Sequence, residues 1–215
     1  MTEADVVLTD YVLAAESALF AWLLSRQPSI APGLRDPFVL FFTATAAGSL
    51  TGGTVHGFFL SEASPVGVVL WRVALLSLGV AALSAWTIGA RMLFSPPTAQ
   101  GIQVTAACLW LVYAAVVVAV NDSFWVAVVN YLPVTLFLAV ALVVAYRSTG
   151  ELAMAIGVAG LVLTVVAALV QQLHVALHPR YFNHNALYHA IQAVALFMIF
   201  WSARSLVRQT WEAAI

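Results

Sequence analysis

Seven long apolar stretches constrain this chain more than any other feature of its sequence. A helix that crosses a bilayer needs about 20 mainly apolar residues. Charged residues make up only 8% of the chain, against roughly 25% in soluble domains, which is too few to cover a water-facing surface. We therefore predict an all-α polytopic membrane protein, with residues 1–215 forming one domain that is a seven-transmembrane-helix bundle. The predicted spans lie near Val6–Leu24, Phe38–Leu60, Pro65–Phe94, Gln103–Val120, Ser123–Tyr146, Leu152–Leu177 and His184–Val207.

The charged and sulfur-containing residues exclude several classes of protein. The net charge is −1, and the basic residues are eight scattered arginines with no lysine. Nucleic-acid binding needs a basic surface, so we expect no nucleic-acid partner. A rhodopsin that holds retinal as a Schiff base is excluded because it needs a lysine. The single cysteine, Cys108, excludes a disulfide framework within the chain and a thiolate metal cluster.

The distribution of the arginines predicts the orientation of the bundle. Positively charged residues are enriched in cytoplasmic loops. Arg180 falls in a loop on one side and Arg72 falls within the third span, whereas the other arginines fall on the opposite side. This puts the amino terminus outside and the carboxyl terminus in the cytoplasm. An Ala/Val-rich, lysine-free composition is typical of a GC-rich bacterial genome, so we expect the bacterial inner (plasma) membrane. The arginines on the cytoplasmic side are Arg26, Arg35, Arg91, Arg147, Arg204 and Arg208.

Polar residues of the spans fall in one layer. At 1.5 Å per helical residue, their predicted depths are roughly 5–16 Å from the outer face. The inner half is almost entirely hydrocarbon. Polar and ionisable groups are costly in lipid and usually face a bundle interior or a cavity. The residues of this layer are Asp10, Glu16, Ser49, His56, Arg72, Asn130, Gln171, His174, His189 and Gln192.

Helical spacing also groups these residues on common faces. Residues i, i+4, i+7 and i+11 of a helix share one stripe. This rule predicts three polar faces, on the second, sixth and seventh spans. Their members are Thr45, Ser49, Gly52 and His56; Gln171, His174 and His178; and Asn185, His189 and Gln192.

The histidines suggest a metal centre. All five lie at the outer ends of the second, sixth and seventh spans or in the last loop. A catalytic zinc site takes three protein ligands and a water, and His56, His174 and His189 come from three helices at similar depth. His178 replaces His174 as the expected ligand if the sixth helix is rotated or longer.

Acidic and polar residues at the same depth complete a hypothetical reaction centre. Zinc lowers the pKa of its bound water and polarises a carbonyl. Asp10 or Glu16 would accept the proton of that water, and Ser49 or Arg72 would stabilise an oxyanion. We therefore expect a zinc-dependent hydrolase of a lipid amide or ester, with membrane lipids as its surroundings and a lipid substrate that enters from the outer leaflet.

The same features resemble the CREST superfamily, which includes alkaline ceramidases and adiponectin-receptor-like proteins. Seven helices, Ser49 and His56 on the second span, and His189 on the seventh carry the resemblance. It implies a seven-helix zinc hydrolase. The family pattern has Ser and His four residues apart, whereas here they are seven apart. Glu62 is the acidic residue near the start of the third span, and Asn185 stands where the family has the first histidine of its last motif.

Three other interpretations remain open. Ser, Asn, Gln and His often only hydrogen-bond neighbouring membrane helices, and Glu16 with Arg72 would then be a buried ion pair. Two histidines on facing helices can ligate haem, and exposed histidines can bind copper, as in a redox protein. A ligand sensor without catalysis is the third interpretation. The sequence does not specify the oligomeric state.

Overall fold

The computed structural model describes residues 3–28, 33–59, 64–178 and 181–208. Within them the chain forms seven helices, each long and apolar enough to cross a membrane. This confirms the predicted all-α class with seven membrane-spanning candidates. The helices are α1 (Ala4–Ser25), α2 (Arg35–Phe58), α3 (Pro65–Leu93), α4 (Pro96–Ala119), α5 (Phe124–Thr149), α6 (Leu152–Gln172) and α7 (His184–Arg208).

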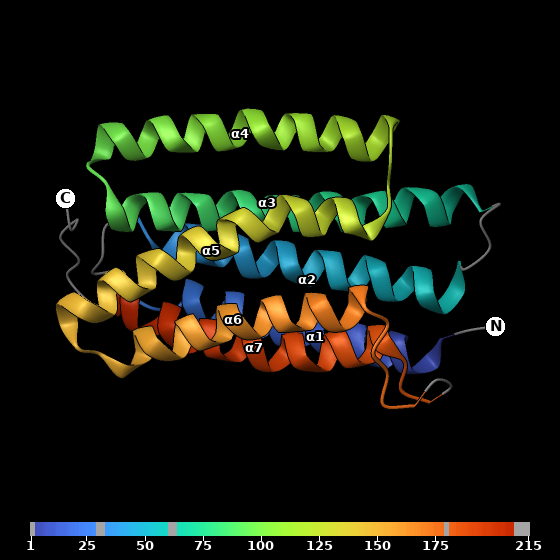
Figure 1. The fold of residues 1–215 in the computed structure, drawn as a ribbon. Coiled ribbons are helices and arrows are strands. Elements are labelled where there is room, and N and C mark those ends of the chain that lie inside the picture. Colours follow the sequence, from blue (N-terminus) through green and yellow to red (C-terminus); the bar gives the residue numbers. More distant parts are fainter. Residues whose placement is uncertain (1–2, 29–32, 60–63, 179–180, 209–215) are drawn as a thin grey trace.

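By their contacts, six of the helices form a closed ring, and α4 lies apart from it on the side of α3 (Figure 1). Around the ring, α1 packs against α2, α2 against α3, α3 against α5, α5 against α6, α6 against α7, and α7 against α1. The remaining helix, α4, packs on the outer side of α3. We call the end of the bundle that contains the starts of α1 and α7 the N-terminal end. The interior of the ring is the place where polar side chains can avoid lipid.

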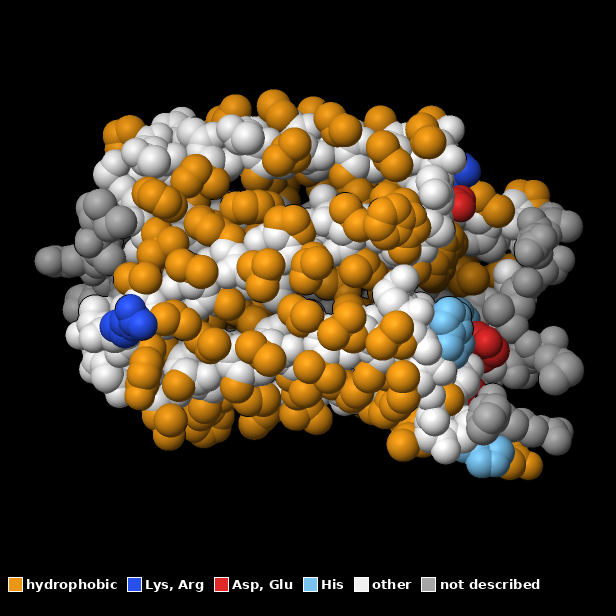
Figure 2. All heavy atoms as spheres, viewed as in Figure 1, with side chains coloured by type: hydrophobic (Ala, Val, Ile, Leu, Met, Phe, Trp, Pro, Cys, Tyr) orange, Lys and Arg blue, Asp and Glu red, His pale blue; other side chains and the backbone are white. Residues whose placement is uncertain are grey.

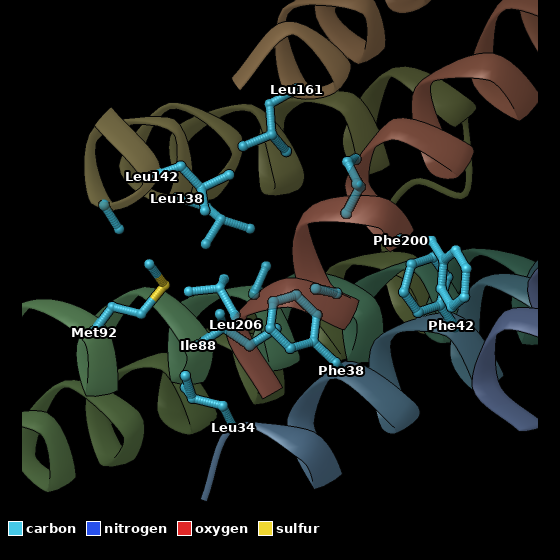
Figure 3. Close-up of a cluster of buried hydrophobic side chains, with 14 of the residues drawn as sticks. Leu34, Phe38, Phe42, Ile88, Met92, Leu138, Leu142, Leu161, Phe200 and Leu206 are labelled. Atoms are coloured by element: carbon cyan, nitrogen blue, oxygen red, sulfur yellow. The ribbon is translucent and has the colours of Figure 1, made fainter. Parts of the chain in front are cut away.

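Apolar side chains fill the half of the ring away from the N-terminal end (Figure 3). Phe20 stacks on Phe200 with ring centroids 4.3 Å apart, and the edge of Phe42 meets Phe20 at 5.5 Å. These three rings join α1, α2 and α7. The apolar inner half predicted from the sequence is therefore a packed core that closes the ring at this end.

Two glycines permit close helix contacts that a side chain would block. A Cβ on Gly160 would lie 2.8 Å from the backbone oxygen of Ala195, so α6 meets the backbone of α7 directly. A Cβ on Gly53 would lie 2.8 Å from the Cβ of Asp10. Small residues at such contacts let membrane helices approach closely. The second contact fixes the position of Asp10 against α2.

Two helix boundaries lie far from the predicted ones, whereas the others agree to within about three residues. α4 begins at Pro96 instead of Gln103, because proline suits the first turn of a helix, where its missing N–H has no partner to lose. α6 ends at Gln172 instead of Leu177, and His174 has a left-handed backbone with φ 56°. Leu60, the expected last residue of the second span, and Pro179, expected to end the sixth, lie outside the described residues.

Hydrogen bonds tie α1 to α7 at the N-terminal end. The Asp5 carboxylate accepts a hydrogen bond from the backbone N–H of Asn183 at 2.9 Å. The side-chain oxygen of Asn183 accepts from the N–H groups of Asn185 and Ala186, which caps the start of α7. Figure 2 shows acidic and histidine side chains gathered at this end, a basic group at the opposite end and a mainly hydrophobic surface between the two ends. The capped start of α7 places the residues that follow it against α1.

Candidate functional site

A narrow cavity of about 190 Å³ runs inside the ring from the N-terminal end. Its lining extends from His56 to Phe41 on α2, from Trp71 to Ala85 on α3, and from Asn185 to Ile199 on α7. At 1.5 Å per residue, each of these runs is roughly 20 Å long, which is about two-thirds of the thickness of a bilayer's hydrocarbon core. The cavity is therefore long and thin, and suits one extended chain better than a compact molecule.

A buried histidine–carboxyl pair lies at the polar end of the cavity. Nε2 of His189 is 3.2 Å from Oδ1 of Asp10, and the two side chains are 11% and 5% exposed. Nδ1 of His189 is 3.2 Å from the hydroxyl of Thr9. Both ring nitrogens thus face oxygen atoms, which fixes the orientation of the imidazole. Asp10 and His189 both line the cavity, so a ligand there can exchange hydrogen bonds or protons with this pair.

His56 lines the same end of the cavity from α2. Its Nδ1 is 2.7 Å from a carboxylate oxygen of Glu3, and its ring meets the ring of Trp71 edge-on at 6.2 Å. The Glu3 carboxylate and the indole hold this imidazole from two sides. The cavity thus has a second oriented imidazole beside the Asp10–His189 pair.

Two buried polar atoms along the cavity lack protein partners among the described residues. The Gln192 side chain donates to the Thr164 hydroxyl at 3.3 Å, but its own oxygen has no hydrogen-bond donor. The Tyr131 hydroxyl is also unpaired and buried. Both residues line the cavity. Since buried polar groups are nearly always hydrogen-bonded, these atoms are positions where a ligand or water would bind.

The far end of the cavity is apolar. Ser49 is buried and lines its middle, seven residues from His56 on the same face of α2. Beyond this point the walls are almost wholly hydrocarbon. The cavity therefore changes from polar to apolar along its length, as an amphipathic ligand does. Its apolar wall includes Leu13, Leu78, Ala81, Ala82, Ala85, Leu138, Leu161, Leu196 and Ile199.

Four of the eight site residues predicted from the sequence meet in this cavity. Asp10, Ser49, His56 and His189 all line it. So do the other members of two predicted faces, on α2 and α7, which confirms that these faces turn inward. These other members are Thr45, Gly52, Asn185 and Gln192.

The predicted face on the sixth span is wrong. α6 ends at Gln172, and the left-handed backbone of His174 breaks the helical spacing. Gln171 still lines the cavity and donates to the Asn185 side chain at 3.3 Å. His174 instead lies beside His184, and His178 forms a short antiparallel bridge with Phe182 in the loop. Neither His174 nor His178 lines the cavity.

Glu16 and Arg72 also lie away from the cavity lining, and they do not pair with each other. Six residues at about 100° each put Glu16 roughly 120° around α1 from Asp10. One of its carboxylate oxygens is buried without a partner among the described residues. Arg72 donates to the Asp122 carboxylate at 3.2 Å, and Trp71 donates to the Asp122 backbone oxygen at 2.6 Å. Arg72 therefore fastens α3 to the turn between α4 and α5.

The donor set does not fit the predicted zinc site. The predicted catalytic zinc site needs three protein ligands at about 2.0–2.3 Å from a common centre. The described residues contain no group of three histidine, cysteine, aspartate or glutamate side chains that could hold a metal ion. His56 and His189 share a cavity, but the third expected ligand, His174 or its substitute His178, does not line it. Glu62, the acidic residue quoted for the CREST resemblance, lies outside the described residues.

Several residues of the site were not predicted from the sequence. Glu3 and Thr9 orient the two histidines, while Tyr131, Thr164 and Tyr188 line the cavity. Tyr188 precedes His189 and Thr9 precedes Asp10 in the sequence, and this adjacency is the one local feature that could have indicated them. Tyr131 and Thr164 carry no local signal, because only the packing of α5 and α6 turns them inward.

Comparison with known proteins gives a family but no activity. The chain matches, over residues 6–208, the model of a family of unknown function, DUF6962, and belongs to that family. No curated protein and no solved structure matches the chain.

Proposed function

We propose that this member of DUF6962 is an integral membrane protein that binds a lipid amide or ester in its cavity and hydrolyses the amide or ester bond. One observation carries the proposal: a cavity roughly 20 Å long begins at a buried histidine–carboxyl pair and ends among hydrocarbon side chains. A narrow cavity of about 190 Å³ suits one acyl chain, with its polar group beside Asp10 and His189.

The unpaired polar atoms support this class of ligand. The Gln192 oxygen can accept a hydrogen bond, and the Tyr131 hydroxyl can donate one. An amide offers both a donor and an acceptor, and an ester offers acceptors. Sites that leave such groups unpaired without their ligand discriminate strongly for ligands that pair them.

The proposed orientation places the cavity on the non-cytoplasmic side. Arg26, Arg35, Arg91 and Arg147 lie at the ends of helices opposite the N-terminal end, as do the two arginines of α7. By the positive-inside rule that end is cytoplasmic, so the polar end of the cavity faces outward. We propose the bacterial inner membrane as the location, on the grounds of composition.

The proposed chemistry is proton transfer by the Asp10–His189 pair. Hydrolysis needs a base that takes the proton of the attacking water and an acid that returns it to the leaving group. His189, held by Asp10 and Thr9, is the group placed to do both. Because the donor set does not fit zinc, no step of this mechanism uses a metal.

Binding can be tested with a pair of matched variants. Ala81 lines the cavity, whereas Ala107 on α4 is exposed on the outer surface. The protein is purified in detergent and its bound lipids are identified by mass spectrometry. We expect a stoichiometric single-chain amide or ester in the wild type and in Ala107→Phe, and a loss of it in Ala81→Phe. Equal lipid content in all three proteins would refute a ligand in the cavity.

Turnover separates an enzyme from a sensor. We expect hydrolysis of a panel of N-acyl amides and acyl esters by the wild type, and a reduction of about 10²–10⁴-fold in His189→Gln. A non-catalytic sensor is the second candidate, favoured by the oxygen partners at both nitrogens of His189. Lipid binding without turnover of any panel member would establish it. A visible spectrum and a metal analysis of the same preparation test the haem and copper alternatives.

A further inference from the structure

Outside the cavity, two histidines from different segments lie against each other at the N-terminal end. His174 follows the end of α6, and His184 is the first residue of α7. Their ring centroids are 4.5 Å apart, with the ring planes inclined by 48°. This is the distance range at which two imidazoles can direct one nitrogen each toward a shared ion. Neither residue lines the cavity.

A hydrogen bond from Nδ1 of His174 favours the tautomer in which Nε2 is free to bind a metal ion. Its Nδ1 is 3.1 Å from the backbone oxygen of Gln172. A carbonyl oxygen only accepts, so Nδ1 carries a proton, and in the neutral imidazole Nε2 then keeps its lone pair. Histidines that bind metals commonly donate their other ring N–H to a backbone carbonyl in this way, which fixes both tautomer and orientation.

The end of α6 sets the position of the His174 backbone. His174 has φ 56°, and it is the one non-glycine residue of the described chain with a positive φ. Helices commonly end with a left-handed residue just after the cap. The N–H groups of His174 and Val175 donate to the backbone oxygens of Gln171 and Val170, the bonds of that helix-ending motif. Here the conformation brings His174 back toward His184.

We infer that His174 and His184 together bind a divalent transition-metal ion such as Zn²⁺. Imidazole nitrogens suit zinc and copper, whereas magnesium prefers oxygen ligands. The carboxylate of Glu3 lies close enough to His184 for their charges to interact, so negative charge is present near the ion. Water molecules complete the coordination, since the described residues hold no group of three metal-ligating side chains. This site does not depend on the proposed function of the cavity.

The ion would join the end of α6 to the start of α7 at the rim of the cavity. Gln171 and Asn185, which flank the pair in sequence, share a hydrogen bond of 3.3 Å and line the rim. A metal bridge beside this bond would hold the two helix ends together. Zn²⁺ should therefore raise the melting temperature of the protein as well as bind to it.

Calorimetric titration of the full chain with Zn²⁺ tests the inference. The protein carries a purification tag other than polyhistidine, and Mg²⁺ serves as the control ion. His174→Asn removes the imidazole while asparagine tolerates the left-handed backbone. We expect one Zn²⁺ site in the wild type, no Mg²⁺ binding, and Zn²⁺ affinity lower by at least roughly 10–100-fold in His174→Asn and in His184→Gln.

Two control variants locate the ion. His178→Gln changes another exposed histidine of the same loop, and His189→Gln changes the cavity; both should bind Zn²⁺ as the wild type does. Loss of binding in His189→Gln would place the ion in the cavity and overturn the inference. So would absence of Zn²⁺ binding in the wild type, or unchanged affinity in His174→Asn and His184→Gln proteins that melt at the wild-type temperature.

Discussion

Asp10 is the residue on which the polar end of the cavity depends. It is 4% exposed, and its Oδ1 lies 3.2 Å from Nε2 of His189. Asp10→Asn keeps the size of the side chain and one acceptor oxygen, whereas Asp10→Ala leaves Nε2 of His189 buried without a partner. We expect Asp10→Ala to cost about 1–3 kcal/mol of stability and Asp10→Asn much less. Thermal unfolding in detergent measures both, and equal melting temperatures would show that the pair does not stabilise the fold.

Replacing Glu16 is expected to stabilise the protein, whereas replacing Asp10 is expected to destabilise it. Its buried carboxylate oxygen has no described partner, and the side chain lies outside the cavity lining. Burying a polar group without a hydrogen bond is unfavourable, so Glu16→Leu should raise the melting temperature and leave lipid content and turnover unchanged. A lower melting temperature would indicate that the carboxylate has a partner, and lost turnover would return Glu16 to the active site.

The sequence could have shown that Glu16 lies on a different face of its helix from Asp10. It could not have shown that Asp122 is the partner of Arg72. Simple helical spacing separates the faces of Asp10 and Glu16. The partner of Arg72 is Asp122, which lies 50 positions away and at a turn. No local pattern connects those two residues, because the contact arises from the packing of α3 beside the turn between α4 and α5.

At the scale of elements, α1 approaches α2 closely at Gly53, whereas the adjacent Gly52 has room for a side chain. A Cβ on Gly53 would lie 2.8 Å from Asp10 Cβ and 3.1 Å from the Tyr11 ring, whereas one on Gly52 would lie 3.7 Å from the Asp10 carboxylate. We expect Gly53→Ala to cost about 1–3 kcal/mol, the usual range for overpacking, and Gly52→Ala to leave the melting temperature unchanged. If both variants unfold at the same temperature, the close approach of α1 and α2 at Gly53 is not a constraint.

Helical periodicity predicted α2 and α7 correctly and failed at the end of α6. The stripe from Thr45 to His56 lies within one uninterrupted helix, so its spacing holds in the fold. Past Gln172 the sequence remains apolar, with no glycine or proline before Pro179. The helix nevertheless ends there, with His174 in a left-handed conformation and its N–H bonded to the backbone oxygen of Gln171. The two histidines expected in the zinc site were misplaced for this reason.

At the scale of the whole molecule, the depth of a residue along its span was easier to predict than the helices that pack around it. Counting residues along alternating spans places Asp10, His56 and His189 at one end of the bundle, and the fold agrees. The cavity itself depends on which helices form the ring. With α4 outside and α3 packed directly on α5, chain order does not give the order of packing, so the cavity could not be predicted from the sequence.

Orientation is the whole-molecule property that decides from which side a ligand arrives. Ser123 lies at the N-terminal end and Ser148 at the opposite end, and both are exposed. In a Cys108→Ala background, which removes the one native thiol, each serine is replaced in turn by cysteine. Intact cells or spheroplasts are then treated with a membrane-impermeant thiol reagent, with permeabilised cells as the control.

Ser123→Cys should react in intact cells, and Ser148→Cys should react only after permeabilisation. The physical reason is that most of the arginines lie at the same end of the bundle as Ser148, since cytoplasmic loops retain positive charge. The reverse labelling would place the Asp10–His189 end in the cytoplasm. A lipid substrate would then come from the inner leaflet, and the His174–His184 pair would meet cytoplasmic instead of external metal ions.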